Sequence, residues 1–418
     1  MRIAFLVVHF PVAAETPFLN QITGLLDRGH DVQVLADAPP RGELIHPDVA
    51  RYGLVARTSY PPRLPKGAVA RLRAVRRELS GRGGAERRLL LRALDPRRAF
   101  PPRPMNLFAQ TLRCLPGMRF DAVQACFGPD GIRAARLRRI GVLHGPILTA
   151  IRGYDISKYV RRRGAGEFAA LFRDGERFLP VCESLASRLR RLGCPADRIV
   201  VHHTGIQLRD HPFRPRACPV DRPLRLVTVG RLVEKKGVAY GLEVVASLAR
   251  EGRAVEYHVI GDGPLRGELE QLAAACPPGS VRFHGALLPD AVRSALDGMD
   301  VMLAPHVTAI DGDMEGIPNV LKEAMALGLP VVTTSHSGIP ELVRNGETGF
   351  LARERDVPGL VRGVLALLES PGRWAPVTAA ARGRVEQDFD IDRLNDRLVR
   401  LYQEAAAGHT ARLPEPSR

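Results

Sequence analysis

The sequence lacks paired cysteines and long apolar runs. Its six cysteines lie far apart with no C-x-x-C pair, so neither a cysteine zinc cluster nor a disulfide framework is indicated, and a reducing compartment fits. No apolar run reaches the roughly 18 residues that a membrane span needs. The start MRIAFLVVHF has no small-residue cleavage site and is typical of a buried strand. We therefore expect a soluble, cytoplasmic protein that is not exported.

Lysine is scarce, since only five of the 61 basic residues are lysines, a bias typical of a GC-rich genome. The formal net charge is +16, and residues 51–103 alone hold 15 basic and 3 acidic side chains. Such an excess favours contact with anionic partners, although an arginine-rich insertion can also be a merely solvated surface. The segment has no aromatic interleaving and no nucleic-acid-reading motif. A nucleic-acid partner is therefore not expected.

The first half of the chain alternates between short apolar runs and helical periodicities. With 418 residues, of which 45% are hydrophobic and 25% charged, the chain is long enough for two or three globular domains. Regular alternation of strand and helix predicts an α/β fold with a parallel sheet covered on both faces. The expected strands are 2–8, 31–36, 121–127, 146–151, 177–181 and 198–202, and the expected helices are 15–28 and 183–192.

Four prolines in residues 211–223 indicate a linker, because they interrupt any helix or central strand. We predict an N-terminal Rossmann-like domain over residues 1–210, with a basic insertion at about 51–103, and a second Rossmann-like domain over residues 224–390. An amphipathic helix over 391–407 is placed to cross back to the first domain, and 408–418 are expected to form a flexible tail. In the second domain the expected strands are 224–229, 255–260, 301–304 and 329–333, and the expected helices are 237–250, 264–275 and 318–327.

Charged residues with the spacing of a phosphate and ribose site follow the strands of the second domain. Arg231 and Lys236 come directly after the expected strand 224–229, where two cations can face a diphosphate. Glu315 lies in a Gly-Ile-Pro loop, and Glu323 lies eight residues later on the helix that begins near Pro318. The N-terminus of such a helix offers free N–H groups to a phosphate or to sugar hydroxyls, and Glu323 can accept hydrogen bonds from a ribose.

These residues resemble the retaining, nucleotide-sugar-dependent glycosyltransferases of family four, which have the GT-B fold of two facing Rossmann-like domains with a cleft between them. The resemblance covers nearly all of the C-terminal half, through GRLVEKKG, VIGDGPL, EGIPNVLKEA and HSGIPELV. The N-terminal half resembles a narrower branch, the exopolysaccharide and colanic-acid transferases, in HFPVAAETPFLNQI and RGYDIS. Residues 51–110 match least.

The resemblance implies transfer of a glycosyl unit from a nucleoside diphosphate sugar to an acceptor hydroxyl, with retention at the anomeric carbon. The residues that it implies in catalysis are Arg231, Lys236, Glu315 and Arg152, and those in acceptor binding are Glu15 and Asp155. The residues expected to bind the donor are Gly230, Gly316, Ile317, Pro318, Asn319, Val320 and Glu323. No cofactor and no metal are expected, since the cations and the helix N-terminus supply positive potential. Asp311-Gly-Asp313 has the D-x-D spacing of GT-A metal ligands but precedes a GT-B motif.

Position 152 departs from the pattern of the related branch. That branch reads T-F-H-G-x-D where this chain has Ala-Ile-Arg-Gly-Tyr-Asp over residues 150–155, so Arg152 replaces a cleft histidine. Arginine accepts no proton near neutral pH, but it can hold an anionic group through two parallel hydrogen bonds. Arg152 therefore recognises a diphosphate or a sugar carboxylate, or only pairs with Asp155 or another carboxylate, or marks a weakened homologue.

The sequence leaves the donor sugar and the acceptor open. The branch resemblance favours a lipid-linked glycan, reached from the inner membrane face if the basic segment binds anionic lipid as a peripheral contact. A small-molecule natural product such as an aminocyclitol or an aminoglycoside is a second acceptor class. A sugar-nucleotide epimerase shares the architecture and donor site, whereas a nucleic-acid binder leaves Glu315 and Glu323 without a role.

Overall fold

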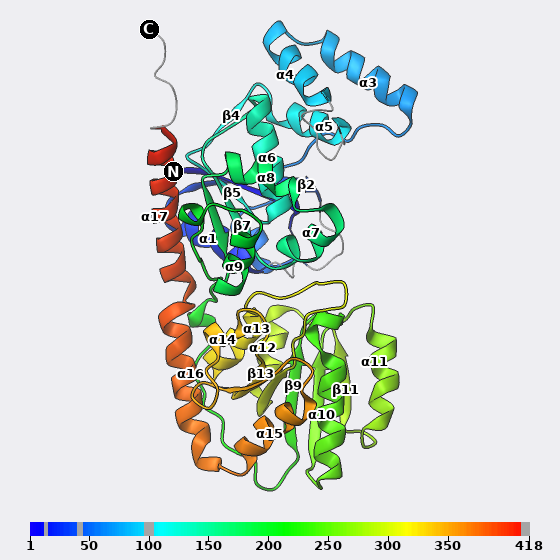
Figure 1. Cartoon of the computed structure of the whole chain (residues 1–418), viewed down its shortest axis with the longest axis vertical. Coiled ribbons are helices and arrows are strands. Elements are labelled where there is room, and N and C mark those ends of the chain that lie inside the picture. Colours follow the sequence, from blue (N-terminus) through cyan, green and yellow to red (C-terminus); the bar gives the residue numbers. More distant parts are fainter. Residues whose placement is uncertain (12–15, 40–44, 96–103, 411–418) are drawn as a thin grey trace.

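The protein folds into two six-stranded parallel sheets, each covered by helices on both faces (Figure 1). The computed structural model describes residues 1–11, 16–39, 45–95 and 104–410. The N-terminal sheet has the order β3-β2-β1-β5-β7-β8, and the C-terminal sheet has the order β11-β10-β9-β12-β13-β14. Both are the 3-2-1-4-5-6 order of a doubly wound fold. The expected α/β fold of two Rossmann-like halves is therefore confirmed.

The strands form the buried centre of each half. Ile3 to Leu6 in β1 and Val301 to Leu303 in β12 are fully buried, because a parallel sheet with helices on both faces exposes neither side to water. The strands of the N-terminal sheet are β1 (Arg2–His9), β2 (Asp31–Ala38), β3 (Thr58–Ser59), β5 (Ala122–Ala125), β7 (Ile147–Ile151) and β8 (Arg177–Pro180). Those of the C-terminal sheet are β9 (Leu224–Val229), β10 (Val255–Ile260), β11 (Val281–Gly285), β12 (Val301–Ala304), β13 (Val331–Thr334) and β14 (Phe350–Ala352).

The helices follow the strands along the chain. In the N-terminal half they are α1 (Thr16–Asp27), α2 (Pro47–Arg51), α3 (Ala68–Ser80), α4 (Gly84–Leu94), α5 (Pro104–Cys114), α6 (Gly128–Ile140), α7 (Lys158–Arg163), α8 (Gly166–Asp174) and α9 (Glu183–Arg191). In the C-terminal half they are α10 (Val238–Arg250), α11 (Arg266–Leu272), α12 (Pro289–Asp297), α13 (Asn319–Leu327), α14 (Ile339–Leu342), α15 (Val357–Leu368) and α16 (Trp374–Asp388). A short parallel pair, β4 (Met118–Arg119) and β6 (Leu143–His144), lies outside the two sheets.

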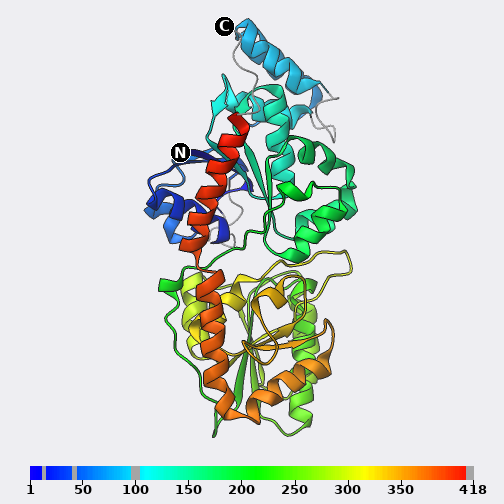
Figure 2. The ribbon, with the colours of Figure 1, turned by 60° about the vertical axis from the view of Figure 1, so that its left-hand side comes forward.

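The chain passes between the two halves twice, and the two passages are joined by backbone hydrogen bonds. Ile206 N–H donates to the Phe389 carbonyl at 2.9 Å, and Ile391 N–H donates to the Ile206 carbonyl at 3.1 Å. The last helix, α17 (Ile391–Thr410), then runs along the N-terminal sheet (Figure 2). The buried Tyr402 hydroxyl donates to Gln124 Oε1 of β5 at 3.0 Å. The C-terminal helix therefore ties the end of the chain to the first sheet.

Two local expectations differ from the structure. Residues 199–202 form no strand: Val200 and His202 donate N–H groups to β8, but only Ile199 makes an isolated bridge. The segment follows the edge of the sheet without a full ladder. Residues 408–410 belong to α17, so the expected tail begins too early, and 411–418 lie outside the described residues. Residues 211–223 contain no helix or strand.

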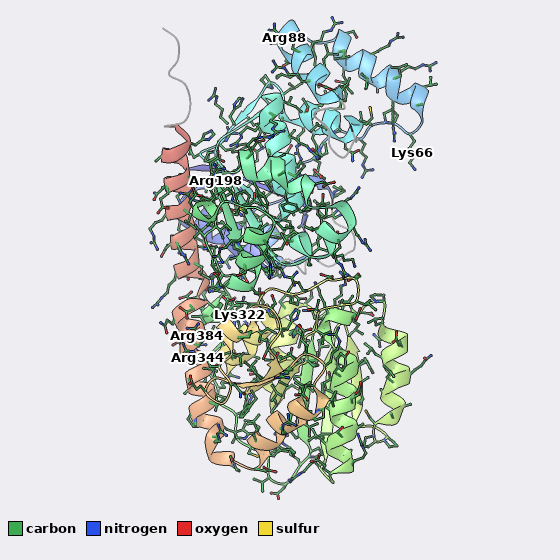
Figure 3. All side chains as sticks on the ribbon, viewed as in Figure 1. Lys66, Arg88, Arg198, Lys322, Arg344 and Arg384 are labelled. Carbon is green, nitrogen blue, oxygen red and sulfur yellow. The ribbon has the colours of Figure 1, made fainter. Side chains whose placement is uncertain are left out.

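Helices α3 and α4, within the basic segment, form an extension at the end of the N-terminal half that is remote from the C-terminal half (Figure 1). Leu90 and Ala93 anchor α4 in the core, whereas Val69 and Leu72 of α3 are 65% and 58% exposed. Basic side chains such as Lys66 and Arg88 extend into solvent around these helices (Figure 3). Of the helices in the described part of the chain, none combines the length and apolarity needed to span a bilayer.

Candidate active site

A pocket of about 320 Å³ lies between the two halves, at the carboxyl ends of the C-terminal strands. Loops that follow parallel strands meet at this edge, which is where ligands bind in doubly wound folds. Of the predicted site residues that the structure describes, the pocket contains all but Arg231 and Asp155. Its lining is Pro17, Arg152, Val181, Thr204, Val229, Gly230, Lys236, Glu315, Gly316, Ile317, Pro318, Asn319, Val320 and Glu323.

Glu315 is held in the pocket by two ammonium groups. Its Oε1 atom lies 3.1 Å from Lys236 Nζ and 3.4 Å from Lys235 Nζ. Burial alone raises the pKa of Glu315, but the two lysine charges outweigh it and hold the pKa well below its usual range. The carboxylate is therefore ionised across the physiological range and can accept hydrogen bonds from hydroxyl groups.

A buried histidine fixes the backbone of Glu315. The Glu315 N–H donates to His336 Nε2 at 3.0 Å, and His336 Nδ1 lies 2.6 Å from Glu354 Oε1. Because Nε2 accepts, Nδ1 carries the proton and donates to Glu354. Glu354 also accepts from the Thr308 N–H at 2.8 Å. This chain of contacts positions the loop that carries Glu315.

Lys236 follows β9 on a tight turn that requires glycine. Gly237 has φ of +66°, and a Cβ there would lie 1.8 Å from the Pro305 carbonyl oxygen. The turn brings the Lys236 side chain back over Gly230 and into the pocket. Arg231, in contrast, is exposed and lies outside the pocket lining. The structure thus separates the two cations that the sequence had paired.

The N-terminus of α13 faces the pocket. The helix begins at Asn319 after Pro318, and no side chain caps its first N–H groups. Those groups and the positive end of the helix dipole attract anions. Asn319 Oδ1 accepts from Lys322 Nζ at 2.8 Å and caps none of these N–H groups. Residues 316–320 therefore offer backbone donors rather than charged side chains.

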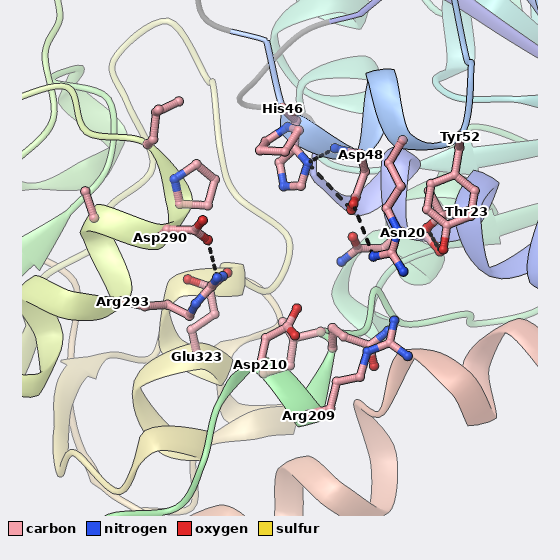
Figure 4. Close-up of a pocket in the computed structure, with 17 residues that line it drawn as sticks. Asn20, Thr23, His46, Asp48, Tyr52, Arg209, Asp210, Asp290, Arg293 and Glu323 are labelled. Carbon is pink, nitrogen blue, oxygen red and sulfur yellow. Dashed lines mark hydrogen bonds and ion pairs between the residues drawn. The ribbon is translucent and has the colours of Figure 1, made fainter.

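Glu323 links this pocket to a larger cavity of about 690 Å³. The cavity lies between α1 and α2 on one side and α12 on the other, and Figure 4 shows Glu323 at its C-terminal wall near Arg293. Arg293 pairs with Asp290. Burial raises the pKa of Glu323, although His211 and Lys322 partly offset this effect. The two spaces share Glu323 in their linings and together form one cleft between the two halves.

The predicted site residues of the N-terminal half differ in their position relative to the pocket. Arg152 lines the pocket, with its guanidinium stacked over the Phe18 ring at 3.9 Å from the centroid. Asp155 is fully buried and accepts hydrogen bonds from the N–H groups of Gly128, Arg152 and Gly153. Asp155 shapes the loop, and the prediction that it contacts an acceptor is wrong because its carboxylate has no access to the cleft. Glu15 lies outside the described residues.

Lys322 is an unexpected buried cation beside the pocket. Its ammonium donates to the Thr204 carbonyl at 2.6 Å, to Thr204 Oγ1 at 2.7 Å and to Asn319 Oδ1 at 2.8 Å. Burial lowers the pKa of Lys322 to about 7, with Glu323 acting in the opposite direction. Because Thr204 precedes the first passage between the halves, Lys322 joins α13 to the N-terminal half. The sequence pattern alone makes it an ordinary surface residue of α13.

The D-x-D residues make ion pairs with lysines. Asp311 pairs with Lys158 of α7, and Asp313 lies 3.2 Å from Lys235 Nζ. The first pair spans the two halves, and the second extends the charge network around Glu315. Within the described residues, these two carboxylates point to different partners.

Comparisons with known proteins agree with this architecture. Residues 14–210 match the model described as Glycosyltransferase Family 4, and residues 223–370 match Glycosyl transferases group 1. The chain is 37% identical over 408 residues to glycosyltransferase WcaL of Escherichia coli (strain K12), named for colanic acid biosynthesis, covering 96% of this chain and all of the relative. The chain is a family 4 glycosyltransferase.

Two further similarities extend the comparison for this glycosyltransferase. The amylovoran biosynthesis glycosyltransferase AmsK of Erwinia amylovora is 34% identical, over 97% of this chain and all of the relative. The structure of Anabaena Alr3699/HepE in complex with UDP and glucose superposes with a TM-score of 0.70 at 17% identity, covering 97% of this chain and all of that chain. The fold is therefore GT-B, as the sequence predicted.

Proposed function

We propose that this glycosyltransferase moves a sugar from a nucleoside diphosphate sugar to an acceptor hydroxyl with retention at the anomeric carbon. The observation that carries the proposal is the placement of Lys236 and the ionised Glu315 in one pocket with the uncapped N-terminus of α13. Positive charge and free N–H groups there suit the developing charge of a departing diphosphate. UDP and glucose in the Anabaena Alr3699/HepE structure support a donor of this class.

Each group in the pocket has a distinct part in the proposed reaction. Lys236 stabilises the leaving diphosphate together with the N–H groups of Asn319 and Val320, and Glu315 orients the sugar through its hydroxyl groups. Glu323 accepts hydrogen bonds from the ribose where the pocket opens into the larger cavity. Arg152, held flat over Phe18, presents a fixed cation at the N-terminal wall. Positioning and preorganised charge then supply most of the rate.

We propose that neither a metal nor a cofactor takes part. Lys235 and Lys236 already lie beside Glu315, and Asp311 and Asp313 are engaged by lysines. Burial lowers the pKa of Lys235, but the charges of Glu315 and Asp313 together outweigh this effect and raise the pKa above its usual value, so Lys235 keeps its charge. Arg231, exposed at the edge of the pocket, adds to the field around the diphosphate from a distance.

The acceptor that we propose is a lipid-linked glycan in the assembly of an exopolysaccharide. Relatives that are similar over their full length are named for colanic acid and amylovoran biosynthesis. The 2-deoxystreptamine glucosyltransferase of Streptomyces kanamyceticus is 33% identical, but over only 37% of this chain. An aminocyclitol or aminoglycoside acceptor is therefore the weaker alternative. Family membership also favours transfer over the epimerase and nucleic-acid-binding alternatives.

The site of action that we propose is the inner membrane face, with the protein in the cytoplasm. On α3 the exposed Val69 and Leu72 lie one turn apart and next to Arg73 and Arg76. This combination of apolar and basic side chains suits the surface of an anionic bilayer, where each basic residue contributes about 1 kcal/mol. The extension would bring the cleft to a lipid-borne acceptor.

A donor and acceptor screen tests the proposed function. The full chain is incubated with UDP-, GDP-, ADP- and dTDP-sugars, with and without lipid-linked glycans or 2-deoxystreptamine, and the products are identified by mass spectrometry. We expect a new glycoside only when both substrates are present, with the anomeric configuration of the donor by NMR, and with full activity in EDTA. Conversion of the donor alone, an inverted product or strict dependence on added manganese would contradict the proposal.

A further inference from the structure

A second space between the two halves has a different character from the cleft. It measures about 440 Å³ and lies between α7 and α9 on one side and the loop 308–312 on the other. Figure 1 shows α7 and α9 at the edge of the N-terminal half that faces the C-terminal half. Its lining contains three arginines and no carboxylate, and consists of Ile156, Ser157, Val160, Arg161, Arg188, Arg191, Leu192, Thr308 and Gly312.

Two of the three guanidinium groups lack a partner. Arg161 Nη1 donates to the Ile310 carbonyl across the domain boundary at 3.1 Å. Within the described chain, the side chains of Arg188 and Arg191 make neither a hydrogen bond nor an ion pair. Burial, and then the neighbouring charge of Arg191, lower the pKa of Arg188. Like charges held together at a half-buried site are stabilised when an anion binds between them.

The space is separate from the donor pocket. Gly153 has φ of +129°, and a Cβ there would lie 2.5 Å from the Met314 carbonyl oxygen, so the two backbones touch between the two spaces. The two linings share no residue. Hydrogen bonds nevertheless connect the arginine pocket to the donor pocket. The Thr308 N–H, in the wall of the arginine pocket, donates to Glu354, and His336 donates to Glu354 as well. His336 in turn accepts from the Glu315 N–H in the donor pocket.

We propose that this arginine pocket binds a phosphate group, free or carried by a larger molecule, and that the bound anion holds the N-terminal half against the loop 308–312. Guanidinium groups pair with phosphate oxygens through parallel hydrogen bonds, and three of them around one space match a phosphate or diphosphate. Thr308, whose hydroxyl donates to Glu354 Oε1 at 3.2 Å, and the backbone near Gly312 form the C-terminal wall. The site is additional to the donor pocket and does not depend on the donor proposal.

Calorimetric titration of the full chain with inorganic diphosphate tests the site. The donor pocket also attracts this probe, so wild type is compared with Lys236→Gln and with the double variant Arg188→Gln/Arg191→Gln. We expect two binding events in wild type, of which Lys236→Gln weakens one and the double variant weakens the other by at least tenfold. Arg190→Gln is the matched control, because Arg190 lies on the same helix but pairs with Glu183 outside the pocket.

Three results would overturn the proposal: a single event that only Lys236→Gln removes, equal binding by wild type and the double variant, or no binding at all. A second double variant, Arg188→Lys/Arg191→Lys, keeps both positive charges and controls for misfolding of the first. We expect it to bind diphosphate several-fold more weakly than wild type, because lysine lacks the two parallel donors of arginine. Unchanged affinity of this variant would also contradict the proposal. Farnesyl diphosphate serves as a second probe. Tighter binding than inorganic diphosphate at the same site identifies a lipid-borne group, and equal binding identifies a free phosphate.

Discussion

Glu315 and Glu323 lie in one cleft but in different electrostatic surroundings. Two lysines hold the Glu315 carboxylate ionised, whereas burial favours the protonated form of Glu323 at the mouth of the larger cavity. In the proposed reaction, a carboxylate next to the leaving-group cation affects the reacting sugar, and one placed a turn and more along α13 affects the ribose. The two glutamates should therefore have separable kinetic effects.

Replacement of each glutamate by glutamine tests this separation. Glu315→Gln should lower turnover by about a hundredfold with little change in nucleotide affinity, because it removes a charge next to Lys236 at the reacting centre. Glu323→Gln should weaken nucleotide binding by about 1 to 3 kcal/mol, the range for a buried hydrogen-bond group that is left unsatisfied. Steady-state kinetics and calorimetry measure the two effects. Equal effects of both variants on affinity and turnover would show that the roles are wrongly assigned.

Lys322 makes the stability of the protein depend on pH. Its pKa is lowered to about 7 in the folded chain, while the unfolded side chain keeps the proton up to a pH of about 10.4. Between these values the unfolded state binds more protons, so the free energy of unfolding should rise with pH in this window. From pH 7 to pH 9, the free energy of unfolding of wild type should rise by about 1 to 2 kcal/mol relative to that of Lys322→Met. Urea denaturation at the two pH values measures this change.

The control for this measurement is Arg250→Gln, an exposed substitution at the end of α10. Its stability relative to wild type should not change with pH. A Lys322→Met difference that is flat from pH 7 to pH 9, or that falls, would show that the buried ammonium keeps its proton through its three acceptors.

The site residues that the sequence identified are those that follow a strand directly or begin a helix. Lys236, Glu315 and Asn319 belong to this group, because loops after parallel strands converge whatever their detailed course. His336, Glu354 and Lys322 act through contacts between separate segments, which depend on tertiary packing. Asp155 was misassigned for the same reason, since its burial under three N–H groups arises from the fold of a loop.

At the scale of elements, α3 combines exposed apolar side chains with arginines. The variant Val69→Ser/Leu72→Ser should reduce flotation with anionic liposomes several-fold, because both side chains are more than half exposed and available to the bilayer. Salt should release the wild type, because the remaining attraction is screened. Val220→Ser, which removes an 88% exposed apolar residue from the linker, is the matched control. Equal flotation of all three proteins, or flotation with neutral liposomes alone, would contradict the membrane proposal.

Elements with continuous apolar runs were predictable, whereas the edge strands β3, β11 and β14 were not. Strands such as β1 and β12 are buried on both faces at their centres and have an unbroken apolar run there. The edge strand β11 reads VRFHG and is only half buried, so its pattern is weak. Residues 198–202 show the opposite case: their apolar pattern predicts a strand, but they run beside β8 without completing a ladder of hydrogen bonds. Partial burial and partial hydrogen bonding are set by neighbours, which a single sequence does not contain.

At the scale of the whole molecule, α17 joins the end of the chain to the N-terminal sheet. Tyr402 is fully buried against that sheet and bonded to Gln124. Tyr402→Ala should destabilise the N-terminal half by about 3 to 5 kcal/mol through loss of the ring and of the hydrogen bond. Arg400→Ala, exposed on the same helix, should stay within about 0.5 kcal/mol of wild type. Chemical denaturation decides between them, and similar midpoints would mean that the helix does not brace the sheet.

The order of the two halves follows from the alternating pattern and the proline-rich linker, but their mutual orientation does not. It depends on contacts such as Lys158 with Asp311, Arg161 with the Ile310 carbonyl, and Lys322 with Thr204. These contacts join residues more than 100 positions apart. The cleft is formed by both halves, so its shape could not be predicted before their mutual orientation was known.

Calorimetric titration of the wild-type chain with UDP, GDP, ADP and dTDP tests the central claim most directly, because it needs no knowledge of the acceptor. The account predicts that one of these nucleotides binds with one-to-one stoichiometry, and that Lys236→Gln weakens its binding at least tenfold while Arg250→Gln does not. If no nucleoside diphosphate binds, or if the Lys236 variant binds as tightly as wild type, the pocket between the two sheets is not the donor site.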